Sequence, residues 1–264
     1  MEGGNAVPEL LELEVTDRVG ILHLKRPPLN ILNRALVTEL AEAAVEAGRS
    51  PGIGAVVISG DGRHFSAGAD VAEFQTMTVP EVHEYGTLLD AAFRGWADLP
   101  RVTIAAVNGY ALGGGCELAL AADFRFASDR ATLGLPEIQL GIIPGAGGTQ
   151  RLPRLIGPAR AKEMIFSGRH VKAEEALAIG LVDAVVPAAE LLERAVEAAR
   201  RYAAGPVVAL QAAKRLVNRA DGDIEVGLDI ERHAFSMLFG TEDWQTGAAS
   251  LAERGPGKAT FRGR

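Results

Sequence analysis

The segment IAAVNGYALGGGCELA, residues 104–119, runs from an apolar β-branched stretch through three consecutive glycines into a second apolar stretch. Residues 102–107 predict a buried strand, and the glycines predict a turn that leads into a helix from about Gly114 to Ala122. Short apolar runs at 55–59 and 124–127 predict two further buried strands. Because strands and helices alternate, we expect an α/β fold over the first 150 residues.

The N-terminal part of the chain continues this alternation. The run Val19-Gly-Ile-Leu-His-Leu-Lys predicts a strand, and the pair Pro27-Pro28 ends it. We expect Asn33 to cap the next helix and Gly48 to end it. The face of this helix that should be buried consists of Leu36, Leu40, Ala43, Ala44 and Ala47.

The C-terminal third has helical periodicity almost throughout. Helices are expected at 159–166, 173–180, 189–203, 206–220 and 223–239, with one short apolar run at 181–186 between them. Their apolar faces exceed what one layer over a sheet requires, and they include Ile230, Phe235, Leu238 and Phe239. This surplus predicts a lid or an interface between subunits, with ordinary packing within the chain as the alternative.

Composition excludes several classes of protein. A single cysteine, Cys116, rules out a disulfide framework, a cysteine-rich zinc module and an iron–sulfur cluster, and it suits a reducing compartment. Lys and Arg number 27 against 34 Asp and Glu, and this formal charge of −7 argues against binding to nucleic acid or anionic membranes. Polar residues and glycines interrupt the most apolar stretch, 102–124, so no membrane span is expected. With no secretory signal pattern at the N-terminus, we expect a cytoplasmic location.

Glycine accounts for 31 of the 264 residues, and 14 of these lie within 52–68 and 109–148. Glycines permit positive φ and let a ligand approach the backbone N–H groups, although they also serve tight packing. At Gly113-Gly-Gly, free amides and the positive end of a helix dipole would stabilise an anion or an oxyanion. Neither the dinucleotide pattern G-x-G-x-x-G nor the Walker pattern occurs here, so we do not expect nucleotide phosphates.

Two carboxylates near these glycines are candidates for acid–base catalysis. Glu117 lies one helical turn after the glycines among apolar neighbours, and burial would raise its pKa to a range useful near neutrality. Glu137 follows Pro136, where acids are also common for purely structural reasons. Side by side, one carboxylate could activate a water while the other delivers a proton to an activated carbonyl compound. The alternative is that both are ordinary solvent-facing or paired acids.

Other polar residues are weaker candidates. Cys116 has no evident histidine base, so a small buried thiol is expected. Asp70 is expected to cap the helix that follows it. Histidines without metal-ligand spacing are expected at the surface, and no metal site is predicted; they are His64, His83, His170 and His233.

These motifs resemble the enoyl-CoA hydratase/isomerase family, the crotonase superfamily. The matching segments are FSAGAD at 65–70, the opening segment at 104–119 and PEIQLGIIPGAGGTQRLPR at 136–154. The resemblance implies a crotonase-like α/β spiral of ββα units over residues 1–200, which carries the active site. It also implies a C-terminal helical region, 201–264, that joins subunits into a homotrimer or a hexamer.

The resemblance implies an acyl-CoA thioester as substrate and no separate cofactor. In such enzymes two backbone amides bind the thioester oxygen, and here they correspond to Ala69 and Gly114. CoA is expected along the segment that contains Ala67, Ala69, Asp70, Val71 and Ala72, beside Gly114, with Arg254 reaching it from a neighbouring subunit.

The implied reaction is syn addition of water to the 2,3-double bond of a trans-2-enoyl-CoA. Glu117 would help to activate the water for attack at C3, and Glu137 would supply the proton at C2. Some dienoyl-CoA isomerases and dehalogenases have an aspartate where this chain has Gly145, which favours hydration. Isomerisation of a Δ3- to a Δ2-enoyl-CoA is the alternative, followed by a non-catalytic or RNA-binding role. Leu133 and Leu135 replace the family's usual Phe and Gln, so acyl chain length and pathway stay open.

Overall fold

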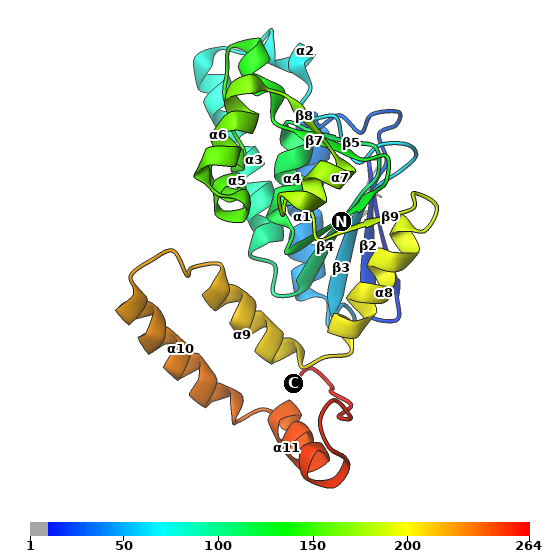
Figure 1. Cartoon of the computed structure of the whole chain (residues 1–264), viewed down its shortest axis with the longest axis vertical. Helices are drawn as coiled ribbons and strands as arrows, with labels where there is room; N and C mark the ends of the chain where they lie inside the picture. Colours follow the sequence, from blue (N-terminus) through cyan, green and yellow to red (C-terminus); the bar gives the residue numbers. More distant parts are fainter. Residues whose placement is uncertain (1–9) are drawn as a thin grey trace, which may run out of the picture.

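The computed structural model describes residues 10–264 and contains two β-sheets surrounded by helices (Figure 1). The larger sheet has, in spatial order, β1 (Leu11–Thr16), β2 (Val19–Leu24), β3 (Ala55–Gly60), β4 (Val102–Val107), β6 (Phe124–Ser128) and β9 (Ala184–Val186). The smaller sheet has β5 (Tyr110–Leu112), β7 (Thr132–Gly134) and β8 (His170–Lys172). The predicted α/β class is therefore confirmed.

The chain passes from one sheet to the other in a repeating order. From β4 in the larger sheet it enters β5 in the smaller sheet and then α4 (Gly114–Ala121). It returns through β6 and β7 to the 3-10 helix η1 (Pro136–Leu140). Apart from the β1–β2 hairpin, all pairings in the larger sheet are parallel. This repetition is the predicted spiral of ββα units.

Alternate residues of the central strands face two different helical layers. Val56 and Ile58 of β3 belong to the core beneath α1 (Arg34–Arg49) and α3 (Val79–Ala97). Val57 points to the other face, where α8 (Leu191–Ala203) packs on β3 and β4. Both faces of the sheet are covered, so these strands are apolar along most of their length, with Ser59 and Thr103 as exceptions. The remaining helices of this part are α2 (Val71–Phe74), α5 (Gly148–Ile156), α6 (Pro158–Ser167) and α7 (Ala173–Ala178).

Helix α1 forms largely as its sequence predicts. Oδ1 of Asn33 accepts a hydrogen bond from the Leu36 N–H at 3.0 Å, and the predicted face is buried. The predicted end at Gly48 is wrong by one residue, because the helix continues to Arg49. The chain leaves the helix at Ser50, whose extended conformation needs no glycine.

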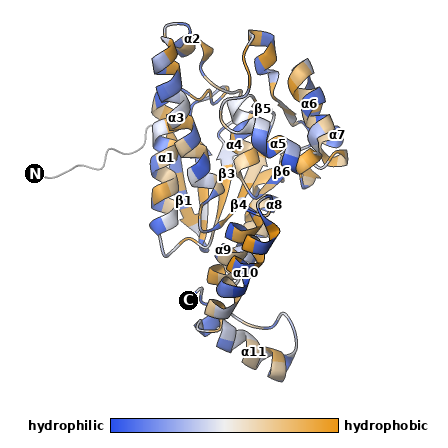
Figure 2. Cartoon of the chain, turned by 90° about the vertical axis from the view of Figure 1, so that its left-hand side faces the viewer, coloured by the Kyte–Doolittle hydropathy of each residue, from blue (hydrophilic) through white to orange (hydrophobic). Residues whose placement is uncertain are grey.

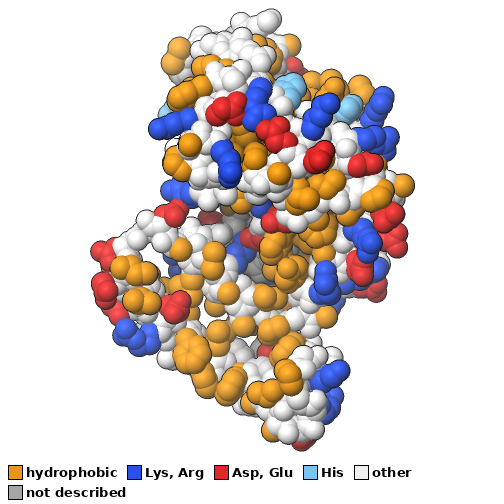
Figure 3. Space-filling view, in the orientation of Figure 1, with side chains coloured by type: hydrophobic (Ala, Val, Ile, Leu, Met, Phe, Trp, Pro, Cys, Tyr) orange, Lys and Arg blue, Asp and Glu red, His pale blue; other side chains and the backbone are white. Residues whose placement is uncertain are grey.

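The C-terminal helices α9 (Val207–Val217), α10 (Ile224–Leu238) and α11 (Glu242–Arg254) project from the body of the molecule (Figures 1 and 2). Helix α9 is held by Lys214, whose ammonium donates to Asp123 at 2.8 Å and to the Arg101 carbonyl at 2.9 Å. None of the residues of α10 is buried. Several of its apolar side chains are exposed, and hydrophobic atoms are prominent on this part of the surface (Figure 3); they include Ile224, Ile230, Phe235 and Met237. No part of residues 10–264 covers this apolar surface.

Across the described part of the chain, residues 10–264, every helix falls short of the length or the apolarity needed to cross a bilayer.

Two loops approach each other so closely that one position accepts only glycine. A Cβ at Gly115 would overlap the Ser66 carbonyl oxygen and would lie 2.8 Å from the Ser66 Cβ. The obstacle is backbone, so it has little freedom to move away. Gly86 in α3, by contrast, has no atom within 4 Å of a built Cβ.

We therefore expect Gly115→Ala to lower the free energy of unfolding by about 3 kcal/mol, the upper end of what overpacking costs. Gly86→Ala should raise it by about 0.5 kcal/mol, because alanine is the better helix former. Urea unfolding followed by circular dichroism measures both. Equal stability of the two variants would contradict the close approach of the loops.

Candidate active site

The turn between β5 and α4 meets the loop that follows β3. Gly113 has φ 52° and ψ −127°, a conformation open only to glycine. Gly68 in the facing loop has φ 103°, and a Cβ there would lie 2.8 Å from the Leu112 carbonyl oxygen. These two glycines therefore let the turn and the loop lie against each other.

Two backbone amides are left free where these segments meet. Leu32 donates to the Gly68 carbonyl and accepts from the Asp70 N–H, which turns the N–H of Ala69 away from Leu32. Gly114 is the first residue of α4, where a helix leaves its N–H groups without partners. A Cβ built at Gly114 would lie 3.7 Å from the Ala69 nitrogen. Within residues 10–264 neither amide donates a hydrogen bond, so both are available to one acceptor.

Buried polar side chains fix the loop that carries Ala69. Ser66 Oγ donates to the Asn30 carbonyl at 2.7 Å and accepts from the Gly68 N–H at 3.2 Å. The Asn30 side chain donates in turn to the His64 carbonyl at 2.8 Å. Sequence reasoning missed both Ser66 and Asn30. The available signal was an asparagine directly after the Pro27–Leu29 turn, since asparagine tolerates the left-handed φ of 47° found there.

Glu117 lies on the first turn of α4 with only 3% of its surface exposed. Its Oε1 accepts hydrogen bonds from the Ala146 and Gly148 N–H groups, both at 2.8 Å. Burial raises the pKa of this carboxyl, while the two amides and the charge of Arg151 act against the rise. No hydrogen-bond partner of Oε2 occurs within the described chain, so that oxygen can bind a water.

Glu137 lies on η1, beside the Gly113 turn. Its Oε1 is 3.0 Å from the position that a Cβ of Gly113 would occupy. Its Oε2 is buried, and no group in residues 10–264 forms a hydrogen bond with it. Burial raises the pKa of Glu137 from 4.5 to about 7, and the charge of Glu117 adds to the rise. Glu137 therefore holds a proton near neutral pH more readily than an exposed glutamate does.

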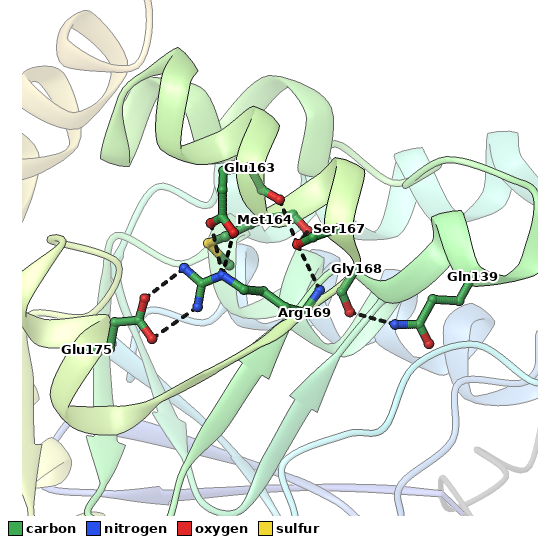
Figure 4. A network of polar contacts seen from close by, with 7 residues as sticks. All are labelled: Gln139, Glu163, Met164, Ser167, Gly168, Arg169 and Glu175. Atoms are coloured by element: carbon green, nitrogen blue, oxygen red, sulfur yellow. Dashed lines mark hydrogen bonds and ion pairs between the residues drawn. The ribbon is translucent and has the colours of Figure 1, made fainter.

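A polar network behind η1 holds the helix that carries Glu137 (Figure 4). The Gln139 amide donates to the Gly168 carbonyl at 2.9 Å. Arg169, which follows Gly168, forms a bidentate ion pair with Glu175 and a second ion pair with Glu163. The Gln139 contact fastens η1 to the segment between α6 and β8, and Arg169 ties that segment to α6 and α7.

The structure brings most of the predicted site residues together. Ala67, Ala69, Asp70, Val71 and Ala72 lie on the loop and short helix next to Gly114, and Glu117 and Glu137 flank the two free amides. Arg254 does not join them, because it ends α11 at the far end of the molecule (Figure 1). Its contact with CoA, which was predicted from a neighbouring subunit, stays a prediction.

The predicted capping role of Asp70 is wrong. Asp70 precedes α2, but its side chain forms no capping hydrogen bond there. The carboxylate instead accepts from Arg26 Nη2 at 3.2 Å. The same guanidinium donates to the Ile31 carbonyl at 2.9 Å within its own loop, and its pair with Asp70 ties the β2–α1 loop to the loop of Ala69.

His64 also differs from its predicted surface position. It is half-buried, its ring stacks on Tyr110 with 4.5 Å between centroids, and Nδ1 accepts from the Tyr110 N–H at 3.0 Å. His83, His170 and His233 are exposed as predicted.

Cys116 is fully buried, as expected of a structural thiol, and burial raises its pKa to about 12. Among residues 10–264, no three His, Cys, Asp or Glu side chains lie close enough together to hold a metal ion.

Leu133 and Leu135, which replace the family's usual residues, are fully buried. Leu135 packs against Gly148, where a built Cβ would lie 2.9 Å from Leu135 Cδ1. Leu135 therefore supports the segment whose amides bind Glu117.

Comparison with known proteins agrees with the fold. Residues 14–264 match the model of the family described as Enoyl-CoA hydratase/isomerase, and the chain belongs to this family. The crotonyl-CoA hydratase of Syntrophomonas wolfei is 39% identical over 249 residues, which cover 93% of this chain and 96% of that protein. The short-chain-enoyl-CoA hydratase of Clostridium acetobutylicum is 41% identical over 245 residues, 92% of this chain and 94% of the relative.

A solved structure is similarly close. The crystal structure of an enoyl-CoA hydratase from Bacillus anthracis superimposes with a TM-score of 0.92 at 38% identity. The match covers 97% of this chain and all of that one. This likeness extends the family's fold through the C-terminal helices.

The raised pKa of Glu137 predicts a pH-dependent cost in stability. Between its ordinary value of 4.5 and its folded value of about 7, the folded state binds the proton more tightly than the unfolded chain does. Stability attributable to this group is therefore lost as pH rises through that window. Glu137→Gln removes the loss, so the variant should gain roughly 2 kcal/mol over the parent between pH 5 and pH 8. Urea unfolding at both pH values measures the gain.

Glu193→Gln, on the exposed face of α8, is the control and should change stability equally at the two pH values. A Glu137→Gln variant with the same advantage at pH 5 and pH 8 would show that Glu137 is not strained by burial.

Proposed function

We propose that this chain is an enoyl-CoA hydratase that adds water to a trans-2-enoyl-CoA and yields a 3-hydroxyacyl-CoA. One observation carries the proposal: two free amides, of Ala69 and Gly114, meet beside two carboxylates in different surroundings, the buried Glu117 and the half-buried Glu137. The amides suit a thioester oxygen that gains negative charge. The carboxylates suit the transfer of one proton from water and of another to carbon.

The division of labour follows from the surroundings of each carboxyl group. Glu117 has two amide donors and a nearby guanidinium, which stabilise its ionised form, and its Oε2 would hold and deprotonate the water that attacks C3. Glu137 has a buried oxygen with no partner, which favours the neutral acid, and it would protonate C2. Because water adds from one side of the substrate, the new C–O bond at C3 and the new C–H bond at C2 form on the same face.

The names of the relatives support this choice within the family. Proteins about 40% identical to this chain over more than nine-tenths of its length are named crotonyl-CoA hydratase and short-chain-enoyl-CoA hydratase. The acidic balance of the sequence, with 34 Asp and Glu against 27 Lys and Arg, does not suit an RNA-binding role. A cytoplasmic location and the absence of any cofactor besides the CoA of the substrate stay predictions.

For the CoA moiety, we propose the loop from Ala67 to Ala72, with Arg254 supplied by another subunit. The uncovered apolar face of α10 supports an assembly of identical chains through residues 201–264, as a homotrimer or a hexamer. Residues 1–200 would then carry the site. Sedimentation equilibrium measures the state of assembly, and a monomer at micromolar concentration would contradict this part of the proposal.

The activity is tested with crotonyl-CoA, whose conjugated enoyl absorbance disappears on hydration. Identification of 3-hydroxybutyryl-CoA by mass spectrometry supports the hydratase. A 3-enoyl-CoA supplied in a parallel assay tests for isomerisation, because an isomerase converts it to the conjugated 2-enoyl product. Failure to hydrate 2-enoyl-CoA thioesters of short, medium and long chain would overturn the proposal.

Glu117→Gln and Glu137→Gln should each lower kcat by about 10²–10⁴-fold, the usual contribution of a positioned acid or base. KM should change little, because the amides of Ala69 and Gly114 still bind the thioester. Steady-state kinetics with crotonyl-CoA provide the measurement, and Glu193→Gln is the matched control with unchanged kcat. Near-normal turnover in either site variant would exclude that glutamate from the chemistry.

A further inference from the structure

Arg151, in the first turn of α5, lies over the segment Ala146–Gly148, whose N–H groups bind Glu117. Its Nη1 donates to the Ala146 carbonyl at 2.8 Å, and its backbone N–H donates to the Gly147 carbonyl at 2.8 Å. The guanidinium lies directly over Gly147, where a built Cβ would be 2.9 Å from Cζ. Gly147 has φ 106°, so the segment from Ala146 to Gly148 follows a path that admits the arginine only because this residue is glycine.

The two sides of this segment form hydrogen bonds with side chains of opposite charge. On the inner side, the N–H groups of Ala146 and Gly148 donate to Glu117 Oε1. On the outer side, Arg151 binds the carbonyls of Ala146 and Gly147. The Gly147 carbonyl and the Gly148 N–H belong to one peptide group. By holding that carbonyl, the backbone of Arg151 sets the direction of the N–H that reaches Glu117.

Glu117 is the acid whose charge acts most strongly on Arg151. Among the ion pairs within residues 10–264 none includes Arg151, although the residue is half-buried. The charge of Glu117 is the leading electrostatic influence on Arg151 that opposes the effect of burial on its pKa. Arg154, one turn further along the same helix, is exposed and pairs with Asp221 instead.

Besides this pair, the nearby ionisable groups lie on α3, α4 and η1. On α3, Asp90 and Arg94 face Arg151 and pair with each other at 3.0 Å, and Asp98 lies further along. The Cys116 thiol is neutral near neutral pH, since burial raises its pKa to about 12. On the side of η1, the neighbour is Glu137, which burial favours in its neutral form.

We propose that Arg151 is a positioning residue for Glu117: its guanidinium fixes the Ala146–Gly148 segment and supplies the counter-charge to the carboxylate across it. Arg151 itself does not touch the substrate. The inference rests on the proposed function only insofar as the ionised Glu117 is the base that activates water. The hydrogen bonds and the charge both favour the form of Glu117 that accepts a proton.

Arg151→Met removes the guanidinium and its charge while it keeps much of the side-chain volume. We expect kcat for crotonyl-CoA hydration to fall by about 10–100-fold with KM nearly unchanged, as for other residues that orient a catalytic group. Loss of the positive charge raises the pKa of Glu117, so the acid limb of the kcat profile should move to higher pH. Arg154→Met, the same substitution one turn away, should leave kcat and the pH profile unchanged.

Arg151→Lys separates the charge from the hydrogen-bond geometry. It keeps a cation, so the acid limb should stay close to that of the parent, while kcat still falls because an ammonium cannot cover Gly147 as the planar guanidinium does. Parent values of kcat and an unmoved acid limb in Arg151→Met would overturn the proposal. If the methionine variant does not fold, unchanged kcat in Arg151→Lys overturns it, and reduced kcat with unchanged KM supports it.

A second readout does not depend on turnover. Infrared difference spectra against pH report the protonation of buried carboxyl groups, and Glu117→Gln identifies the band of Glu117. In Arg151→Met that band should titrate at higher pH than in the parent, and an unmoved titration would contradict the proposal. A parent protein that hydrates no enoyl-CoA would refute the proposed function, while this titration would still test the role of Arg151.

Discussion

The contact between the Ser66 carbonyl and Gly115 is the constraint on which the rest of the site depends. It joins the loop after β3 to the turn after β5, and it requires that α4 begin without a side chain at this point. Once the two segments touch, the amides of Ala69 and Gly114 lie next to each other without any further device. Helix α4 begins directly after the β5–α4 connection, and Glu117 lies in its first helical turn. Backbone geometry therefore places the two free amides, and side chains are needed mainly to hold that geometry.

The side-chain contacts that hold these loops in place join residues far apart in the sequence. This explains which features could be predicted from the sequence and which could not. The strands at 55–59 and 102–107, the cap at Asn33 and the burial of Glu117 follow from local patterns of apolar residues and glycines. The resemblance to a known family supplied the pairing of Glu117 with Glu137, which spacing alone left open.

Other contacts lay beyond any local pattern. The ion pair of Arg26 with Asp70 joins residues 44 positions apart, and the hydrogen bond from Tyr110 to His64 spans 46. A propensity argument assigned Asp70 to capping because it considers only near neighbours along the chain. The folded loops offered a guanidinium instead, and a charge-assisted bond to it is the stronger interaction.

The two carboxyl groups show how a site can be costly to the fold and useful to chemistry. Glu137 has a buried oxygen that finds no hydrogen-bond partner in residues 10–264, which a core designed only for stability would exclude. Glu117 is deeper, yet its two amide bonds and the nearby Arg151 offset part of the cost of burial. A bound substrate or water would complete the hydrogen bonding that Glu137 lacks.

The spiral gives this site a modular logic. Glu117 follows the strand pair β4–β5, and Glu137 follows the strand pair β6–β7, so the two acids occupy corresponding places in consecutive turns of the same repeat. The amide pair lies on the first of these turns and on the loop before it. A change confined to the turn of β6–β7 can thus remove or replace the second acid and leave the two free amides in place. In the proposed reaction, such a scaffold would separate substrate activation from the choice of reaction, so that each could vary without the other.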